Sequence, residues 1–236
     1  MTHAGTIVSV NGQVAATRPD GTRRRLHHGE PLYVDDIVDT ASRSWLTAAF
    51  ADGTLFTISQ NGRFSLDAFY FDVRSGGGLI EAWVMEGTFS VTGGMIVRQE
   101  DSEALIRTRD ATIALPGPGG AIAGKISASE RVTLFTLLAE DDGRIGCAQV
   151  ETDAGFVSLN SEFETTVVTD AARMPSRPVV VTSADLFDLY GLFRDRSERF
   201  SIRIPRTSKL ERPKDAVIVE GSNDMPVWTV PPSRTR

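Results

Sequence analysis

The stretch LTAAFADGTLFTISQNGRFSLDAFYFD, residues 46–72, decides the fold class. Large apolar side chains alternate with small or polar ones along it, and Asp52-Gly53 and Asn61-Gly62 interrupt the alternation. A period of two that is broken by Asp-Gly and Asn-Gly is typical of short strands joined by tight turns. We therefore predict a three-stranded β-meander here, in which the carboxylate of Asp52 serves its own turn.

The same pattern extends towards the N-terminus. Residues 5–11 and 13–18 alternate as strands on either side of Asn11-Gly12. Three arginines, Arg23, Arg24 and Arg25, follow the next turn. Successive strand residues point to opposite faces, so Arg23 and Arg25 share a face that Arg24 does not. A charge-protected edge strand is favoured over a phosphate-binding patch.

Composition excludes several classes of function. The chain has 236 residues and a formal charge of −6, whereas a general nucleic-acid binder carries a basic surplus. A single cysteine, Cys147, rules out an intrachain disulfide and lies in a strand-like run, as a small buried residue does. The histidines His3, His27 and His28 are all within the first 28 residues, far from Cys147 in sequence. We therefore expect neither a catalytic cysteine nor a metal site.

The sequence also lacks the signals of metal loops and of membrane insertion. The acids of residues 30–40 do not have the spacing of a calcium loop, and Asp35-Asp36 is interpreted as the turn into a strand at residues 37–40. No run approaches the roughly 18 apolar residues of a transmembrane helix, and the first residues lack the pattern of a secretory signal. As written, the sequence predicts no membrane insertion and a cytoplasmic location.

The order of these motifs resembles that of the FecR domain, a β-rich bacterial module, and that of retention modules of type I secreted adhesins. The resemblance is carried by GTIVSVNGQV, LHHGEPLYVDDIVDT, residues 46–72, LIEAWVMEGTFSVTGGMIVR and TRDATI, and by paired closing strands within residues 142–160. It covers about residues 5–168 and implies a periplasmic or cell-surface setting with protein partners. A turn glycine is common in the family where Asp35 stands.

The sequence departs from the family pattern in two further ways. The usual Ile-Arg-Gly-Thr turn is replaced by the Pro/Gly-rich residues 114–121, and we interpret Pro116 to Gly124 as a flexible connection rather than a ligand-binding loop. The helical segment and membrane span that precede the domain in FecR proteins are not present in this sequence, so sigma-factor signalling is not carried over.

The C-terminal region differs in composition. The consecutive valines of residues 179–181 predict a short edge strand. Ser183 is a good N-cap for a helix over residues 184–193, whose Leu186, Leu189, Tyr190 and Phe193 share one face that we expect to dock on the sheet. Residues 197–236, the tail, carry eight basic and five acidic residues, a net +3 that leaves −9 on the rest of the chain. We predict a β domain at residues 1–169, a linker and docking helix at 170–196, and an extended basic tail at 197–236.

Taken together, the patterns predict an all-β fold: a twisted antiparallel meander, sandwich or roll of many short strands, with one C-terminal helix and an extended tail. We expect a non-enzymatic structural or protein-interaction module without cofactors, which assembles or docks through strand edges and the tail. Alternatives are a ligand-binding or retention-like module of the cell envelope and, with little support, an enzyme. The expected partner-binding residues are Val217, Ile218, Val219, Val227, Trp228, Val230, Arg203 and Arg206.

Overall fold

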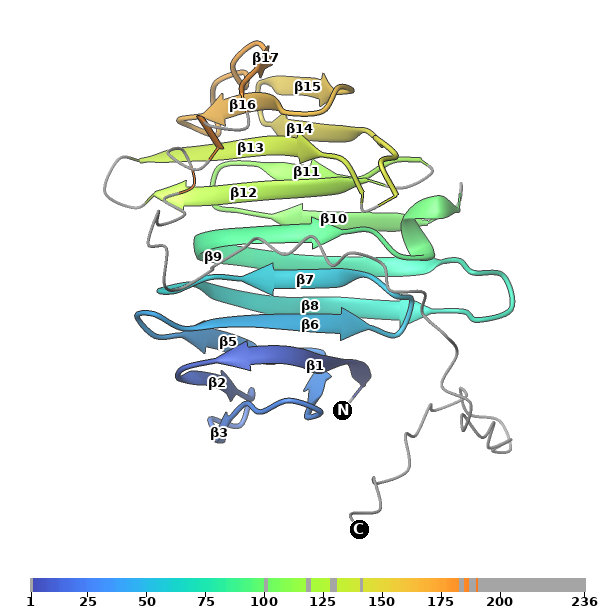
Figure 1. The fold of residues 1–236 in the computed structure, drawn as a ribbon, viewed down its shortest axis with the longest axis vertical. Coiled ribbons are helices and arrows are strands. Elements are labelled where there is room, and N and C mark those ends of the chain that lie inside the picture. The colour runs from blue at the N-terminus through green and yellow to red at the C-terminus, as the bar shows by residue number, and fades with distance from the viewer. Residues whose placement is uncertain are drawn as a thin grey trace. The chain divides into compact units, whose positions relative to one another are not determined.

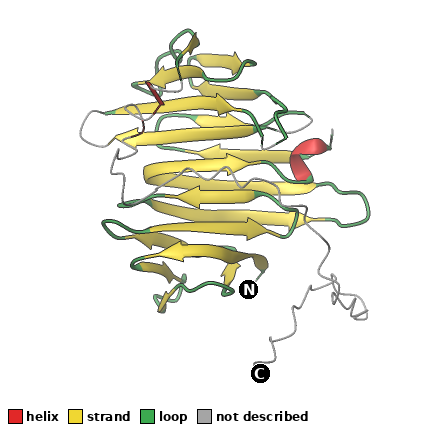
Figure 2. Ribbon diagram, viewed as in Figure 1, coloured by secondary structure: helices red, strands yellow, loops and turns green. Residues whose placement is uncertain are grey.

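The computed structural model describes residues 2–99, 102–117, 120–127, 131–140, 142–182, 185–186 and 190. The regular structure of this part of the chain consists of 17 strands, one short 3₁₀ helix, η1 (Ile96–Arg98), and the helical residues Asp185, Leu186 and Tyr190 (Figures 1 and 2). The prediction of an all-β fold with many short strands is confirmed. All the strands belong to one compact unit, Met1–Ile204.

The strands form two layers, here called sheet A and sheet B, that share the long strand β9 (Gly78–Thr92). Sheet A has the order β4 (Pro31–Tyr33), β1 (His3–Asn11), β6 (Trp45–Phe50), β7 (Leu55–Ile58), β9, β12 (Ala121–Ser127), β13 (Val132–Leu138), β16 (Glu164–Val168), β17 (Val179–Val180). Sheet B has the order β3 (Arg23–Arg25), β2 (Val14–Thr17), β5 (Ile37–Thr40), β8 (Arg63–Phe71), β9, β10 (Glu103–Arg107), β11 (Thr112–Ala114), β14 (Ala148–Thr152), β15 (Gly155–Leu159). Every one of these pairs is antiparallel except β9 with β10.

Strand β9 passes from sheet B to sheet A at Gly87. Up to Glu86 it pairs with β8, and from Gly87 onwards it pairs with β12 and then also with β7. Gly87 has a φ of +99°, and a Cβ atom there would lie 2.6 Å from the Cα of Gly62. Both the backbone conformation and the close approach require glycine.

The two turns of residues 46–72 make different connections between strands. Asp52-Gly53 joins β6 to β7 as a hairpin within sheet A, as predicted. Asn61-Gly62 instead carries the chain from β7 in sheet A to β8 in sheet B, where β8 pairs with β5 and β9. The three strands are confirmed, but the predicted meander is wrong at its third strand. Asn11-Gly12 likewise joins β1 of sheet A to β2 of sheet B.

The hydrophobic core lies between the sheets and is dominated by aromatic rings. Phe56 of β7 lies 4.5 Å from Phe64 of β8, measured between ring centroids, so these rings meet across the two layers. Phe56 also stacks on Phe50 of β6 and on Phe89 of β9. All four rings are buried, and they hold the first half of the molecule together around β9.

A second, smaller cluster covers the outer face of sheet A. Tyr190 is buried against Ala121, Ala123 and Leu138, and its hydroxyl donates to the hydroxyl of Thr136 at 2.7 Å. Of the predicted helix at residues 184–193, only Asp185, Leu186 and Tyr190 are described, and all three have helical conformation. Tyr190 and Leu186 lie on the face that the sequence assigned to docking. The domain boundaries drawn at residues 169 and 196 stay predictions.

The interpretation of Pro116 to Gly124 as a flexible connection is wrong for its second half. Ala121 to Gly124 belong to β12, which pairs with both β9 and β13. Gly124 lies directly on the ring of Phe89, since a Cβ there would be 2.3 Å from the ring carbon Cε1. Packing against Phe89 therefore requires a glycine at position 124. In this case the glycine is not a sign of a loop.

Candidate functional site

The predicted partner-binding residues all lie in the tail, outside the described residues. The following residues therefore stay predictions: Arg203, Arg206, Val217, Ile218, Val219, Val227, Trp228 and Val230. The second predicted element of the site, the open strand edges, is within the described part of the chain. Four strands there have a neighbour on one side only, namely β3, β4, β15 and β17.

The edges at the start of the chain, β3 and β4, form the charged end. Arg23 and Arg25 are exposed on β3, while Arg24 points the other way, as the alternation predicted. The Nη2 atom of Arg24 lies 2.5 Å from Oδ2 of the buried Asp36. Tyr33 of β4 contacts these charged groups, because the guanidinium groups of Arg24 and Arg18 both lie over its ring.

Asp36 lies in the predicted turn and also binds two neighbouring strands through its carboxylate. Asp35 has a φ of +68° and takes the left-handed turn position before β5. The Oδ2 atom of Asp36 accepts a hydrogen bond from the backbone N–H of Tyr33 at 3.0 Å in addition to the contact with Arg24. Strands β3, β4 and β5 are thus tied to one carboxylate, and charge covers this end of the sandwich. Charged side chains on an edge disfavour the addition of further strands.

The edges at the other end of the two sheets, β15 and β17, form the apolar end. Phe156 of β15 is 55% exposed, and Val179 and Val180 of β17 are 59% and 66% exposed. Met174, between β16 and β17, is exposed as well. No strand pairs with the outer edge of β15 or of β17 among the described residues. Unpaired backbone edges that carry apolar side chains are the usual template for β-strand addition.

Side-chain contacts fix the geometry of the apolar end. The hydroxyl of Thr152, at the tip of the β14–β15 hairpin, donates to the backbone carbonyl of Arg173 at 2.8 Å. The backbone N–H of Asp153 donates to the carbonyl of Ala171 at 3.0 Å. Met174 packs on Gly155 so closely that a Cβ there would lie 2.4 Å from its sulfur. The hairpin of sheet B is thereby attached to the segment that leads to β17 of sheet A, and both edges are held in place before any partner binds.

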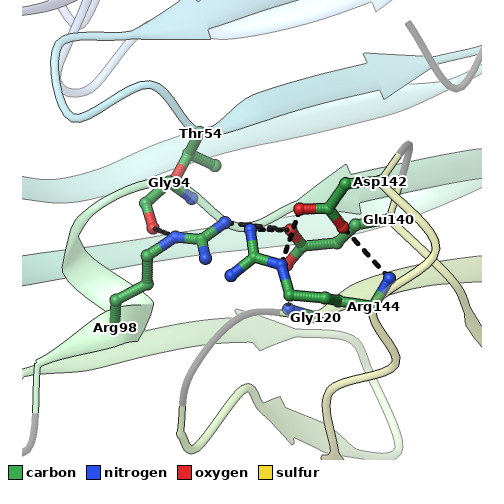
Figure 3. A network of polar contacts seen from close by, with 7 residues as sticks. All are labelled: Thr54, Gly94, Arg98, Gly120, Glu140, Asp142 and Arg144. Atoms are coloured by element: carbon green, nitrogen blue, oxygen red, sulfur yellow. Dashed lines mark hydrogen bonds and ion pairs between the residues drawn. The ribbon is translucent and has the colours of Figure 1, made fainter. Parts of the chain in front are cut away.

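A network of charged groups lies elsewhere, beside the start of β12 (Figure 3). Glu140 is only 7% exposed, and its Oε1 atom accepts a hydrogen bond from the backbone N–H of Gly120 at 2.7 Å. Its Oε2 atom lies 2.9 Å from Nη2 of Arg98 and 3.3 Å from Nη2 of Arg144. The Nε atom of Arg98 donates in turn to the carbonyl of Gly94.

This network has a local part and a part that joins segments distant in sequence. Locally, Asp142 pairs with Arg144, and a hydrogen bond from the backbone N–H of Arg144 lowers the pKa of the Asp142 carboxyl. Asp52 reaches the same region from the β6–β7 turn, because its Oδ2 atom accepts a hydrogen bond from the N–H of Ile96 at 3.2 Å. The carboxylates of Glu140 and Asp52 are engaged in fixing loops, which is a structural role rather than acid–base chemistry.

Substitution of Glu140 by glutamine is expected to lower the free energy of unfolding by about 2 kcal/mol, because the buried negative charge that pairs with Arg98 and Arg144 is removed while both arginines keep their charge. Asp142→Asn, at an exposed position in the same network, is expected to change it by less than about 0.5 kcal/mol. Urea unfolding at neutral pH measures both values. Equal effects of the two substitutions would contradict the structural role assigned to Glu140.

The structure offers little to support chemistry at other places. The thiol of Cys147 donates to the carbonyl of Pro116 at 2.7 Å, and burial raises its pKa, which keeps it in the less reactive protonated form. Among the described residues there is no group of three or more His, Cys, Asp or Glu side chains placed to hold a metal ion. A search of the same residues for a helix of sufficient length and apolarity to span a membrane finds none.

Parts of the chain are similar to solved structures. No protein-family model and no curated protein matches the chain. A solved cell surface anchoring domain is similar to 27% of this chain over 83% of its own length, with 28% identity and a TM-score of 0.26. Two structures of a protein assigned as an anti-sigma factor from Parabacteroides distasonis match 65% and 64% of this chain and 63% of their own, with 14% identity and a TM-score of 0.47. At these TM-scores the likenesses assign no family to the chain.

The exposed Phe156 was missed in the sequence analysis, whereas β17 was predicted. Alternation within residues 155–159 places Phe156 and Ser158 on one face and Val157 and Leu159 on the other, so an exposed phenylalanine was detectable. The consecutive valines of residues 179–181 did predict a short edge strand. The role of Glu140 was not detectable, because its partner Arg98 is 42 positions away.

Proposed function

We propose that the protein is a non-enzymatic, FecR-like structural and protein-interaction module of the bacterial cell envelope. It associates with further copies of itself, or with a protein partner, through the open edges of β15 and β17 and through its C-terminal tail. The FecR-like character rests on the order of motifs in the sequence, and the long two-layer arrangement of short strands agrees with it.

The difference between the two ends of the sandwich carries this proposal. The charged end presents Arg23 and Arg25 at its edge, whereas the apolar end exposes Phe156, Val179 and Val180 beside unpaired backbone. If strand edges were merely solvated surface, both ends would need the same protection by charge. Only the apolar end is suited to accept another strand.

The tail contains two segments with the composition of an added strand. Val217, Ile218 and Val219 form one of them, and the other includes Val227, Trp228 and Val230. Arg203 and Arg206 belong to the basic surplus that the rest of the chain, at −9, attracts. Such attraction acts over about one Debye length, roughly 8 Å at physiological salt, and orients the tail without binding it tightly. Lasting contact comes from burial of the apolar segments, at roughly 25 cal/mol per Å² of apolar surface.

Phe156→Lys with Val180→Lys is expected to reduce the association of the full chain to monomers, because two charges then occupy the apolar edges. Val73→Lys in the β8–β9 turn introduces the same chemistry at an exposed position away from this end and is expected to leave association unchanged. Size-exclusion chromatography with light scattering, over a range of protein concentration, measures the mass. A monomeric wild type at every concentration, or equal behaviour of the edge variant and the control, would overturn self-association.

Deletion of the residues after Arg212 separates two roles of the tail. If the tail adds a strand to a neighbouring copy, the deletion lowers the mass of the assembly. If it adds a strand to its own copy, the mass is unchanged and the melting temperature falls. No change in either quantity would show that the tail takes no part.

A further inference from the structure

A hollow of about 740 Å³ lies on the outer face of sheet B at the charged end. Strands β2, β3, β5 and β8 form it, and the side chains that line it include Gln13, Ala15, Arg23, Arg25, Asp39 and Arg63. Three of these six side chains are arginines, in a protein whose overall charge is −6. Neither the strand edges nor the tail of the proposed function uses this face.

The register of four neighbouring strands explains why the hollow exists. Arg25 is paired with Ala15, Ala15 with Asp39, and Asp39 with Arg63, so these four residues form one row across the sheet. Residues in register on neighbouring strands present their side chains to the same face. Two long arginines therefore stand at the ends of the row, while the methyl group of Ala15 leaves space between them. Arg23, two positions before Arg25 on the same strand, adds a third guanidinium roughly 7 Å along the strand.

The charges in the hollow are not balanced. Nη1 of Arg63 lies 3.2 Å from Oδ1 of Asp39, so these two neutralise one another. Arg25 donates one hydrogen bond to the backbone carbonyl of Gly12 at 3.2 Å, and neither Arg23 nor Arg25 forms an ion pair with any of the described residues. By contrast, the exposed Arg107 forms an ion pair with Glu81, and the exposed Arg109 forms one with Asp110. Two like charges on one strand face repel each other, and an anion between them removes that repulsion.

We propose that this hollow is a binding site for a phosphorylated sugar or a similar small hydroxylated phosphate ester, which is the alternative that the sequence pattern of the three arginines did not favour. The guanidinium groups of Arg23 and Arg25 hold the phosphate oxygens, because a planar fork of N–H donors matches tetrahedral oxyanions. The hollow is larger than a phosphate ion requires and has the size of a small-molecule site. Asp39 and Gln13 supply acceptors for sugar hydroxyls.

Isothermal titration of the full chain with inorganic phosphate, glucose and glucose 6-phosphate tests the proposal. Saturable binding of glucose 6-phosphate is expected, severalfold tighter than that of phosphate, with no detectable binding of glucose. Arg23→Gln with Arg25→Gln is expected to weaken glucose 6-phosphate binding by about tenfold or more, because charge-assisted hydrogen bonds are lost. Arg74→Gln with Arg107→Gln removes the same charge at exposed positions away from the hollow and is expected to change binding less than about twofold.

Asp39→Asn separates the two parts of the ligand. It is expected to leave phosphate binding unchanged or slightly stronger and to reduce the preference for glucose 6-phosphate over phosphate. All substituted residues are at the surface or half-buried, and unchanged melting curves check that the variants fold. Equal weakening by the two double arginine variants, or heat that never saturates with glucose 6-phosphate, would overturn the site. Phosphate that binds as tightly as glucose 6-phosphate would overturn the assignment of a sugar ester.

Discussion

Phe56→Ala is expected to lower the free energy of unfolding by about 3–5 kcal/mol, the largest loss that we predict for a single side chain of the core. The ring of Phe56 is completely buried and contacts three others, those of Phe50, Phe64 and Phe89. These rings belong to both sheets and to the shared strand β9, so the cavity would open where the two layers meet. Surrounding strands are paired on both sides and cannot collapse into the space.

Urea denaturation followed by tryptophan fluorescence measures the loss, and Phe156→Ala is the matched control. Phe156 is the same residue type on the outer face of β15, so its removal is expected to change stability by less than about 0.5 kcal/mol in the monomer. Phe56→Leu, which retains most of the volume, is expected to fall between the two. A loss below about 1 kcal/mol for Phe56→Ala would contradict the packing of the two layers described here.

Gly87→Ala is expected to destabilise the protein by about 3 kcal/mol or more, through strain and a steric clash together. The positive φ of Gly87 disfavours any other residue, and the added Cβ would meet the backbone of Gly62 at 2.6 Å. Neither backbone can move alone, because Gly62 is also held by hydrogen bonds to Thr40.

Gly53→Ala distinguishes the clash from the strain. Gly53 has a similar φ of +89°, but nothing lies within 4 Å of a Cβ placed there. Its substitution is therefore expected to cost only the backbone term, about 1–2 kcal/mol. Thermal unfolding of both variants gives the difference. Equal losses would show that the contact between Gly87 and Gly62 is unimportant at the crossing of β9.

The sequence predicted the strands well because strand formation depends on local alternation. Residues 46–72 contain the three expected strands, at nearly the expected positions. The pairing of those strands was predicted less well. Asp52-Gly53 and Asn61-Gly62 look alike in sequence, yet one makes a hairpin and the other moves the chain to the opposite sheet. Both tasks need a residue with positive φ, so turn chemistry alone does not distinguish them.

The candidate site was predictable only in outline. Open strand edges were expected, and the short strand at Val179 and Val180 was identified. The contrast between a charged and an apolar end depends on which strands are outermost in each sheet. That is decided by long-range strand pairing, which local alternation does not reveal. Asp36 was interpreted only as a turn residue, and the role of Glu140 was not predicted, because the partners of both carboxylates come from other segments. The hollow beside Arg25 likewise requires a row of four strands that are not consecutive in sequence.

The position of β9 has a consequence for how the chain is made. In both sheets the four strands on one side of β9 come from residues before it, and the four on the other side come from residues after it. When residue 92 has left the ribosome, the nascent chain therefore contains β1 to β9 and the aromatic core that these strands enclose. The nascent chain at that moment presents one open edge of β9 in each layer, which the remaining strands extend in the order of their synthesis. The last strands to be synthesised, β15 and β17, are therefore the outermost strands on that side of the two sheets.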